Sequence, residues 1–419
     1  MTDTFTTHTT HLARRHAREK RFQWLGKIAI TLAIGFLVVM IGVIGWIGIG
    51  AFKQTQIALQ VHLDQQEIDT SALEKANYGA LVKKALRLKF PDVKKRRDKR
   101  KLYKLLSSQA SFTLQDHVIA NPALVGQTTK IWFIAADDVD MFFKGNIPVD
   151  SDGNAGKLTT QQLKWVSALD NSGDIHTRFN KGFFLSGDSR EPELAGILSA
   201  FTGTALTLAV CFILSFPIGI LAAIYLEEFT PQNRWSDFIE VNINNLAAVP
   251  SIVFGLLGLA VFLNTFGLPR SSPLVGGMVL ALMTLPTIII ASRAALRAVS
   301  PSIREAALGM GATRLQTVFH HVAPLAMPGM LTGAIVGMAR ALGETAPLLM
   351  IGMVAFIVDT PNSILQPATA LPVQIFLWAD SPERAFLEKT SAAIIVLIAF
   401  LIAMNLLAII LRNKYRKRF

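Results

Sequence analysis

The sequence predicts an all-α polytopic membrane protein with six transmembrane helices and a small α+β extracytoplasmic insert. Two observations lead to this class. Apolar residues make up 51% of the 419 residues and charged residues only 17%, which excludes an ordinary soluble globular protein. The apolar residues also gather in runs that are long enough to cross about 30 Å of hydrocarbon.

The apolar runs are the predicted spans. They cover residues 28–50, 197–225, 246–266, 274–292, 328–355 and 390–411. The first run follows a basic segment, as either a cleavable signal peptide or a membrane anchor would. It exceeds the roughly 7 to 15 apolar residues of a cleavable signal, so we predict a retained first helix.

Lysine and arginine near the spans predict the orientation. They are abundant in residues 1–27, in the loops near 234 and 293–314, and in the tail 412–419. The opposite face carries only Arg270, Arg384 and Lys389. Both termini are therefore predicted to be cytoplasmic. The basic run 94–101 falls on the outer side, but long loops are exempt from this rule.

The runs also predict the domain organisation. The expected units are a cytoplasmic segment 1–27, a first transmembrane helix 28–50, an inserted outer domain 51–195, a transmembrane domain 196–411 and a basic cytoplasmic tail 412–419. Alternating apolar residues predict strands at 57–63 and 175–179, a short apolar run predicts one at 131–134, and 71–88 is predicted to be helical. The basic run 94–101 could bind an acidic partner or anionic lipid, although a solvated helical face is the commoner explanation.

Several function classes are disfavoured by composition. The formal net charge of +12 comes from membrane flanks and one basic run, so no nucleic-acid partner is expected. Cys211 is the single cysteine and lies in an apolar run, and the histidines and aspartates of the insert lack ligand spacing. We therefore expect neither a metal nor a cofactor. No nucleotide-binding Gly-x-x-x-x-Gly-Lys-Ser/Thr loop occurs, so the chain is expected not to be an enzyme.

Residues 300–324 form an amphipathic pattern between two apolar runs. The first helix could start at Ser300-Pro301 or at a capping box of Ser302 with Glu305, and Thr313 with Gln316 offers a second box. An apolar stripe follows until Pro324, which is expected to end the element. Taken alone, this pattern suits a helix that lies in the lipid head groups.

The spacing within this loop carries a resemblance. The matching residues are Glu305, Ala306, Ala307, Gly311 and Pro324. The loop resembles the cytoplasmic coupling loop of ATP-binding-cassette importer permeases, which implies a MetI-like transmembrane fold and docking of Glu305 and Gly311 on a separate ATPase subunit. His321 and Ala323 depart from the family pattern, which usually has a branched aliphatic residue and leucine there.

Arg340 and Glu344 are charges within the fifth apolar run. At spacing i, i+4 they share one helix face, where the glutamate can orient the guanidinium. They could form a buried structural ion pair or line a path for an anion, because charges within spans usually face a bundle interior or a wet pathway. Arg293 could face the same path or extend to the lipid head groups.

Three further segments make the family resemblance more specific. They are FLSGDSREPELAGI at 184–197, NNLAAVPSIVFG at 244–255 and RALGETAPLL at 340–349. Residues 180–411 resemble the PstA type of phosphate permease, and 51–180 resembles the extended amino-terminal region of some members. The resemblance implies a role for Arg293, Arg340 and Glu344 in phosphate passage. It also implies a bacterial inner membrane and, as partners, a second homologous permease, a dimer of ATP-binding subunits, a periplasmic phosphate-binding protein and membrane lipid.

The predicted function is thus that of a transmembrane permease subunit in an ATP-driven importer of inorganic phosphate. A permease for another oxyanion is an alternative, since an Arg/Glu pair does not by itself identify phosphate. A membrane-anchored sensor that uses 51–195 as its ligand-binding module is a further alternative. The predicted cytoplasmic segments are too short for a kinase or cyclase output domain, which disfavours the sensor.

Overall fold

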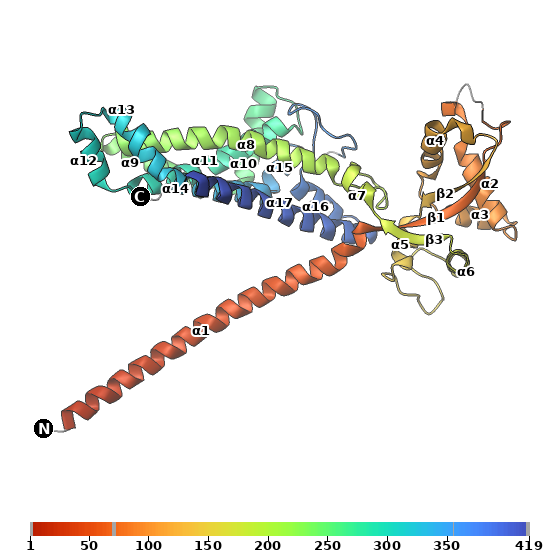
Figure 1. The fold of residues 1–419 in the computed structure, drawn as a ribbon, viewed down its shortest axis with the longest axis horizontal. Coiled ribbons are helices and arrows are strands. Elements are labelled where there is room, and N and C mark those ends of the chain that lie inside the picture. The colour runs from red at the N-terminus through yellow and green to blue at the C-terminus, as the bar shows by residue number, and fades with distance from the viewer. Residues whose placement is uncertain (1–2, 69–72, 355, 416–419) are drawn as a thin grey trace.

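A computed structural model describes residues 3–68, 73–354 and 356–415, and it places an elongated helical bundle beside a separate mixed module (Figure 1). The bundle consists mainly of α8 (Leu198–Ile224), α11 (Pro273–Arg297), α14 (Ala323–Gly343) and α17 (Ala385–Tyr415). The insert lies at one end of it, and α12 (Pro301–Gly309) and α13 (Arg314–Gln316) lie at the other. This arrangement confirms the predicted fold class.

Five helices in the described residues are long and apolar enough to span a membrane. A sixth span exists only if α9 (Arg234–Ala247) and the helix Ser251–Thr265 count as one, and these are bent by 101°. The predicted run 246–266 is therefore not one straight span. The bend falls just before α10 (Ser251–Leu257), whose N-cap is Pro250, and a proline disfavours helical backbone at the residue before it.

The run 328–355 is also divided. Helix α14 ends at Gly343, Glu344 is its extended C-cap, and a short α15 (Ala346–Met350) follows. Pro347 lies in the first turn of α15, where the missing N–H costs nothing. The final helices are α16 (Leu371–Ala379) and α17, and the predicted basic tail lies partly outside the described residues, from 416 to 419.

Close backbone contact holds the bundle together. A Cβ on Gly277 of α11 would come within 2.5 Å of Val210 of α8. On α14, a Cβ on Gly329 would lie 2.6 Å from the Cβ of Ala295 in α11, and a Cβ on Gly333 would lie 2.4 Å from the Cβ of Ala291. Small residues allow such close packing of membrane helices. The contacts also fix α11 and α14 as antiparallel neighbours.

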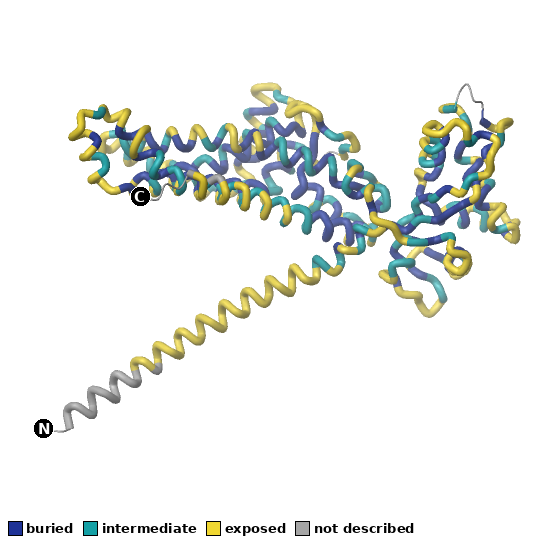
Figure 2. The backbone as a smooth tube through the Cα atoms, viewed as in Figure 1, coloured by how far each residue is buried: buried dark blue, intermediate teal, exposed yellow. Residues whose placement is uncertain are grey.

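Helix α1 (Asp3–Gly48) meets the bundle only at its last turn. A Cβ on Gly48 would lie 2.9 Å from the backbone nitrogen of Ala392 in α17, so these two helices touch there. Away from this contact α1 diverges from the bundle, and the described side chains along it are exposed (Figures 1 and 2). Its apolar part is long enough to span a bilayer.

The insert contains a three-stranded antiparallel sheet in the order β2-β1-β3. The strands are β1 (Lys53–His62), β2 (Thr128–Ile134) and β3 (Ile175–Phe179), in the three places predicted. The helices are α2 (Tyr78–Lys89), α3 (Arg96–Tyr103), α4 (Ala110–Ala120), α5 (Asp137–Phe143), α6 (Thr160–Asn171) and α7 (Lys181–Leu185). Helix α2 begins later than predicted because Asn77 caps it, and residues 71 and 72 lie outside the described part.

The short connecting helices complete the chain. They are η1 (Ile49–Phe52), η2 (Leu73–Lys75), η3 (Pro122–Leu124) and three π-helical segments, η4 (Tyr225–Phe229), η5 (Gly258–Thr265) and η6 (Thr317–Val322).

The sheet and helices of the insert enclose their own apolar core, which includes Ile57, Leu59 and Phe133. The insert is therefore a folded module rather than an extended loop.

Buried polar contacts join the insert to α17. Lys144, at the end of α5, binds Asp140 at 2.5 Å and Glu388 of α17 at 3.3 Å. The side chain of Asn146 also donates to Glu388. The Glu388 and Lys144 side chains are only 7% and 8% exposed, so the charges lie within the junction.

Glu193 lies beside this junction and makes a pH dependence testable. Burial, aided by the negative charge of Asp137, raises the pKa of Glu193 to about 7. Because the pKa of Glu193 is higher in the folded state than in the unfolded state, the folded state binds a proton on Glu193 more tightly. The free energy of unfolding should therefore fall as pH rises from about 4.5 to 7 and level off above, by at most about 3 kcal/mol.

We expect Glu193→Gln to remove this slope and to raise the thermal midpoint at pH 8 relative to the unchanged chain. Tryptophan fluorescence during heating, at several pH values, measures both. The exposed Glu74→Gln is the matched control. Parallel pH profiles for Glu193→Gln and the unchanged chain would contradict the assignment.

Candidate coupling loop and transport path

The loop between α11 and α14 folds as a short helix, a turn and a second helix. Pro301 occupies the first turn of α12, so the helix starts at Ser300-Pro301 rather than at Ser302. Gly311 has φ of +89°, a conformation that glycine adopts readily. Thr313 and Gln316 form the predicted capping box of α13.

The expectation that Pro324 ends this element is wrong. One helix runs from Arg314 to Gly343, and Pro324 lies in the first turn of α14. The π-helical segment η6 precedes it. A proline lacks one backbone N–H donor. The wider π turn changes the hydrogen-bonding pattern just before Pro324, and the helix continues through the proline.

The motif residues divide into an exposed and a buried group. Glu305 and Ala306 are exposed, and a Cβ on Gly311 would meet no atom within 4 Å. Ala307 is 2% exposed and belongs to the packed side of α12. The loop thus presents a free surface at the end of the molecule opposite the insert (Figure 1).

Arg304 holds this loop on the bundle, and the sequence analysis did not identify it. Its guanidinium binds the carboxylate of Glu228 in η4, with the shortest N···O distance at 2.6 Å. It also donates to the backbone oxygens of Val299 and Leu296 at 2.8 and 2.9 Å. Arg304 therefore links α12 to the ends of both α8 and α11.

Arg293 belongs to a second ion-pair group at the same end. It donates to Glu227 at 3.2 Å and to Glu240 of α9 at 2.9 Å, while Arg297 donates to Glu227 at 2.8 Å. These side chains line a cavity of about 430 Å³. Arg293 is 13% exposed and paired with two carboxylates, so it does not simply extend to the lipid head groups.

Arg340 and Glu344 form the predicted i, i+4 pair, with Nε and Oε1 3.5 Å apart. The burial expected of a structural pair is not found, because the Arg340 side chain is 43% exposed. The pair lies at the end of α14, where Glu344 is the C-cap.

The structure does not bring Arg293 and Arg340 together. Gly329 and Gly333 of α14 face Ala295 and Ala291, so Arg293 lies opposite the stretch near residue 331. Arg340 is about nine residues further, or roughly 14 Å along the axis at 1.5 Å per residue. The two arginines thus occupy different levels of the bundle.

Comparisons with known families give one match for the region of α1 and the insert and another for the helical bundle. Residues 215–419 match the model of the family described as "binding-protein-dependent transport system inner membrane component". Residues 9–152, which cover most of α1 and most of the insert, match a family described as "domain of unknown function (DUF3333)". Among solved structures, the inward-facing MetNI methionine ABC transporter aligns with 51% of this chain and 95% of its own, at 18% identity and a TM-score of 0.42.

Individual relatives give a narrower result. The phosphate transport system permease protein PstA 1 of Mycobacterium tuberculosis (strain CDC 1551 / Oshkosh) is 32% identical over 229 residues, which is 54% of this chain and 74% of the relative. The phosphate transport system permease protein PstA of Xylella fastidiosa (strain Temecula1) is 30% identical over 53% of this chain and 77% of its own. The chain therefore belongs to the family of PstA-type transport permeases, with an added folded module between its first two long helices.

Proposed function

We propose that this chain is the permease subunit of an ATP-driven importer of inorganic phosphate in a bacterial inner membrane. The observation that carries the proposal is the 32% identity to a phosphate transport permease over most of that relative's length. The partners in this proposal are a second homologous permease, a dimer of ATP-binding subunits and a periplasmic phosphate-binding protein. The chain itself hydrolyses no ATP.

The free surface of α12 is the proposed docking site for the ATP-binding subunit. Glu305, Ala306 and Gly311 are accessible there, whereas Ala307 packs inward. Movement of the ATP-binding subunits would pull on α12, and Arg304 would pass the displacement to Glu228 at the end of α8. The helices would then rock between inward-open and outward-open states.

Arg340 is the proposed anion contact in the path between the two permeases. A guanidinium offers a planar fork of donors that suits phosphate oxygens, and Glu344 orients it. Arg293 acts nearer the ATPase end. It becomes available to the anion when Glu227 or Glu240 releases it, which makes this group part of an inner gate.

Both termini are proposed to be cytoplasmic. Helix α1 reaches the insert with its last turn, and α17 starts at that same end. The last turn of α17, at its other end, carries Arg412 and Lys414, as expected of a segment on the cytoplasmic side. The insert then lies on the periplasmic side, where the binding protein delivers phosphate.

Uptake by the assembled complex tests the substrate. Vesicles that contain the complex should accumulate labelled phosphate when ATP and the binding protein are supplied. Competition by molybdate or sulfate should be weak. Transport of molybdate or sulfate without phosphate would overturn the substrate assignment and leave the permease role intact.

Reversal of charge at Glu305 tests the docking surface. We expect Glu305→Lys to release the ATP-binding subunit during purification and to abolish uptake, because it places a cation on the proposed contact face. Glu74→Lys, an exposed change in the insert, is the matched control. Retention of the ATP-binding subunit together with normal uptake would rule out this docking role.

A further inference from the structure

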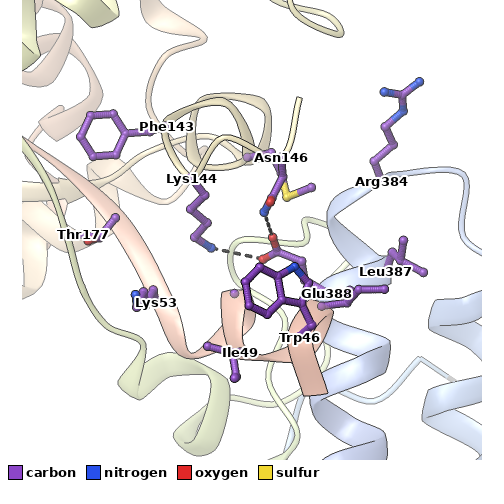
Figure 3. Close-up of a pocket in the computed structure, with 13 residues that line it drawn as sticks. Trp46, Ile49, Lys53, Phe143, Lys144, Asn146, Thr177, Arg384, Leu387 and Glu388 are labelled. Carbon is purple, nitrogen blue, oxygen red and sulfur yellow. Dashed lines mark hydrogen bonds and ion pairs between the residues drawn. The ribbon is translucent and has the colours of Figure 1, made fainter. Parts of the chain in front are cut away.

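A cavity of about 670 Å³ lies where α1, α17 and the insert meet (Figure 3). Trp46 and Ile49 line it from α1 and η1, and Leu387 lines it from α17. Lys53 and Lys144 line it from the insert. The cavity therefore has one apolar wall and one cationic wall.

Its place relative to the membrane follows from the helices. Both α1 and α17 are apolar enough to span a bilayer, and they touch near Gly48 and Ala392 before they diverge. The cavity lies at this meeting point, next to the folded insert. It is thus level with the lipid head groups, while the space between the two helices opens toward the hydrocarbon.

The charges favour an anion. Glu388 is the one carboxylate in the described lining, and it is already bound by Lys144 and Asn146. Lys53 and Arg384 are exposed and make no ion pair with any described residue. Neither of these two cations on the rim is therefore held in a direct ion pair.

The apolar wall favours a lipid over a free anion. Trp46 is 86% exposed and Leu387 is 59% exposed, so both offer apolar surface without a protein partner. Tryptophan is enriched at membrane interfaces, where its ring meets the lipid head groups. A Cβ on Gly42 or Gly45 of α1 would meet nothing within 4 Å, so there is room for another group on that side of the helix.

We propose that this cavity binds the head group of an anionic phospholipid, with its acyl chains in the space between α1 and α17. Lys53 contacts the phosphate from the insert side, and Arg384, on the opposite side of the cavity, contacts the remaining head-group oxygens. Trp46 and Leu387 contact the glycerol and the upper acyl chain. The bound lipid fills the space between the two helices where they diverge beyond their contact at the last turn of α1.

Native mass spectrometry of the full chain tests the site. The protein is equilibrated with an equimolar mixture of phosphatidylglycerol and phosphatidylethanolamine, and retained lipid is counted. We expect preferential retention of phosphatidylglycerol, and a loss of about 10- to 30-fold in Lys53→Gln/Arg384→Gln, since each basic residue near the membrane contributes to this attraction. The control is Lys94→Gln/Arg97→Gln, which removes two exposed cations elsewhere in the insert.

Fluorescence gives a second measurement that does not depend on the double variant. The signal of Trp46 is the difference between the unchanged chain and Trp46→Phe, and brominated phosphatidylglycerol should quench it. Equal retention of the two lipids, unchanged retention in the double variant, or an unquenched Trp46 would each overturn the proposal. An unquenched Trp46 would also point to a protein partner over this face.

Discussion

Arg340→Gln is expected to lower phosphate uptake about 10- to 100-fold while the transporter stays assembled. The change removes charge-assisted hydrogen bonds to the passing anion, each of which contributes about 1.5 to 3 kcal/mol. It should hardly affect stability, because a pair with Arg340 43% exposed contributes at most about 1 kcal/mol. Uptake of labelled phosphate, normalised to the amount of complex, measures the effect.

Glu344→Gln separates the orienting role of Glu344 from the anion contact made by Arg340. If Glu344 only orients the guanidinium, the glutamine can still accept one hydrogen bond, and uptake should fall less than in Arg340→Gln. Arg270→Gln, which removes an exposed arginine from a loop, should leave uptake unchanged. Normal uptake in Arg340→Gln would exclude this residue from the transport path.

Arg304→Glu is expected to abolish coupling while the ATP-binding subunit stays bound. Glu228 is 8% exposed, and the change replaces its partner with a like charge. Breaking a buried pair costs about 3 to 5 kcal/mol, and the partial exposure of Arg304 favours the lower end. Helix α12 should detach from the end of α8 and no longer transmit displacement.

The reversed pair Glu228→Arg/Arg304→Glu tests whether the charge contact itself matters. It should restore part of the uptake, because the ion pair forms again. It should not restore all of it, because a glutamate cannot donate to the carbonyls of Val299 and Leu296. Arg234→Glu, at the exposed start of α9, is the control. Full uptake by Arg304→Glu alone would show that the loop is held by other contacts.

Local patterns were sufficient for much of the fold. Alternation at 57–63 and 175–179 located β1 and β3, and the Thr313/Gln316 box located the start of α13. Both signals act over a few residues and depend on hydrogen bonds or faces that the sequence displays directly. Apolar runs located the spanning segments for the same reason.

The breaks in those runs could not be predicted in the same way. Apolar composition fixes the length that can lie in a membrane but not its straightness, so the bend before Ser251 and the end of α14 at Gly343 were missed. A π turn has the composition of an α-helix. No local pattern therefore indicates that the helix continues from η6 through Pro324.

Long-range ion pairs were the other omission. Arg304 and Glu228 are 76 positions apart, and Arg293 and Glu240 are 53 apart. Neither pair has a spacing signal, since its partners meet only when α8, α9 and α11 have packed. Arg340 and Glu344, in contrast, have an i, i+4 spacing that the sequence displays directly.

The register of the insert's sheet has a consequence for how such a chain can arise. Lys53, the first residue of β1, pairs with Phe179, the last residue of β3. Paired residues of antiparallel strands lie about 5 Å apart, so the chain leaves the membrane part and returns to it at almost one point. The module could thus be gained or lost by a single insertion or deletion, without a change in the order or direction of the spanning helices.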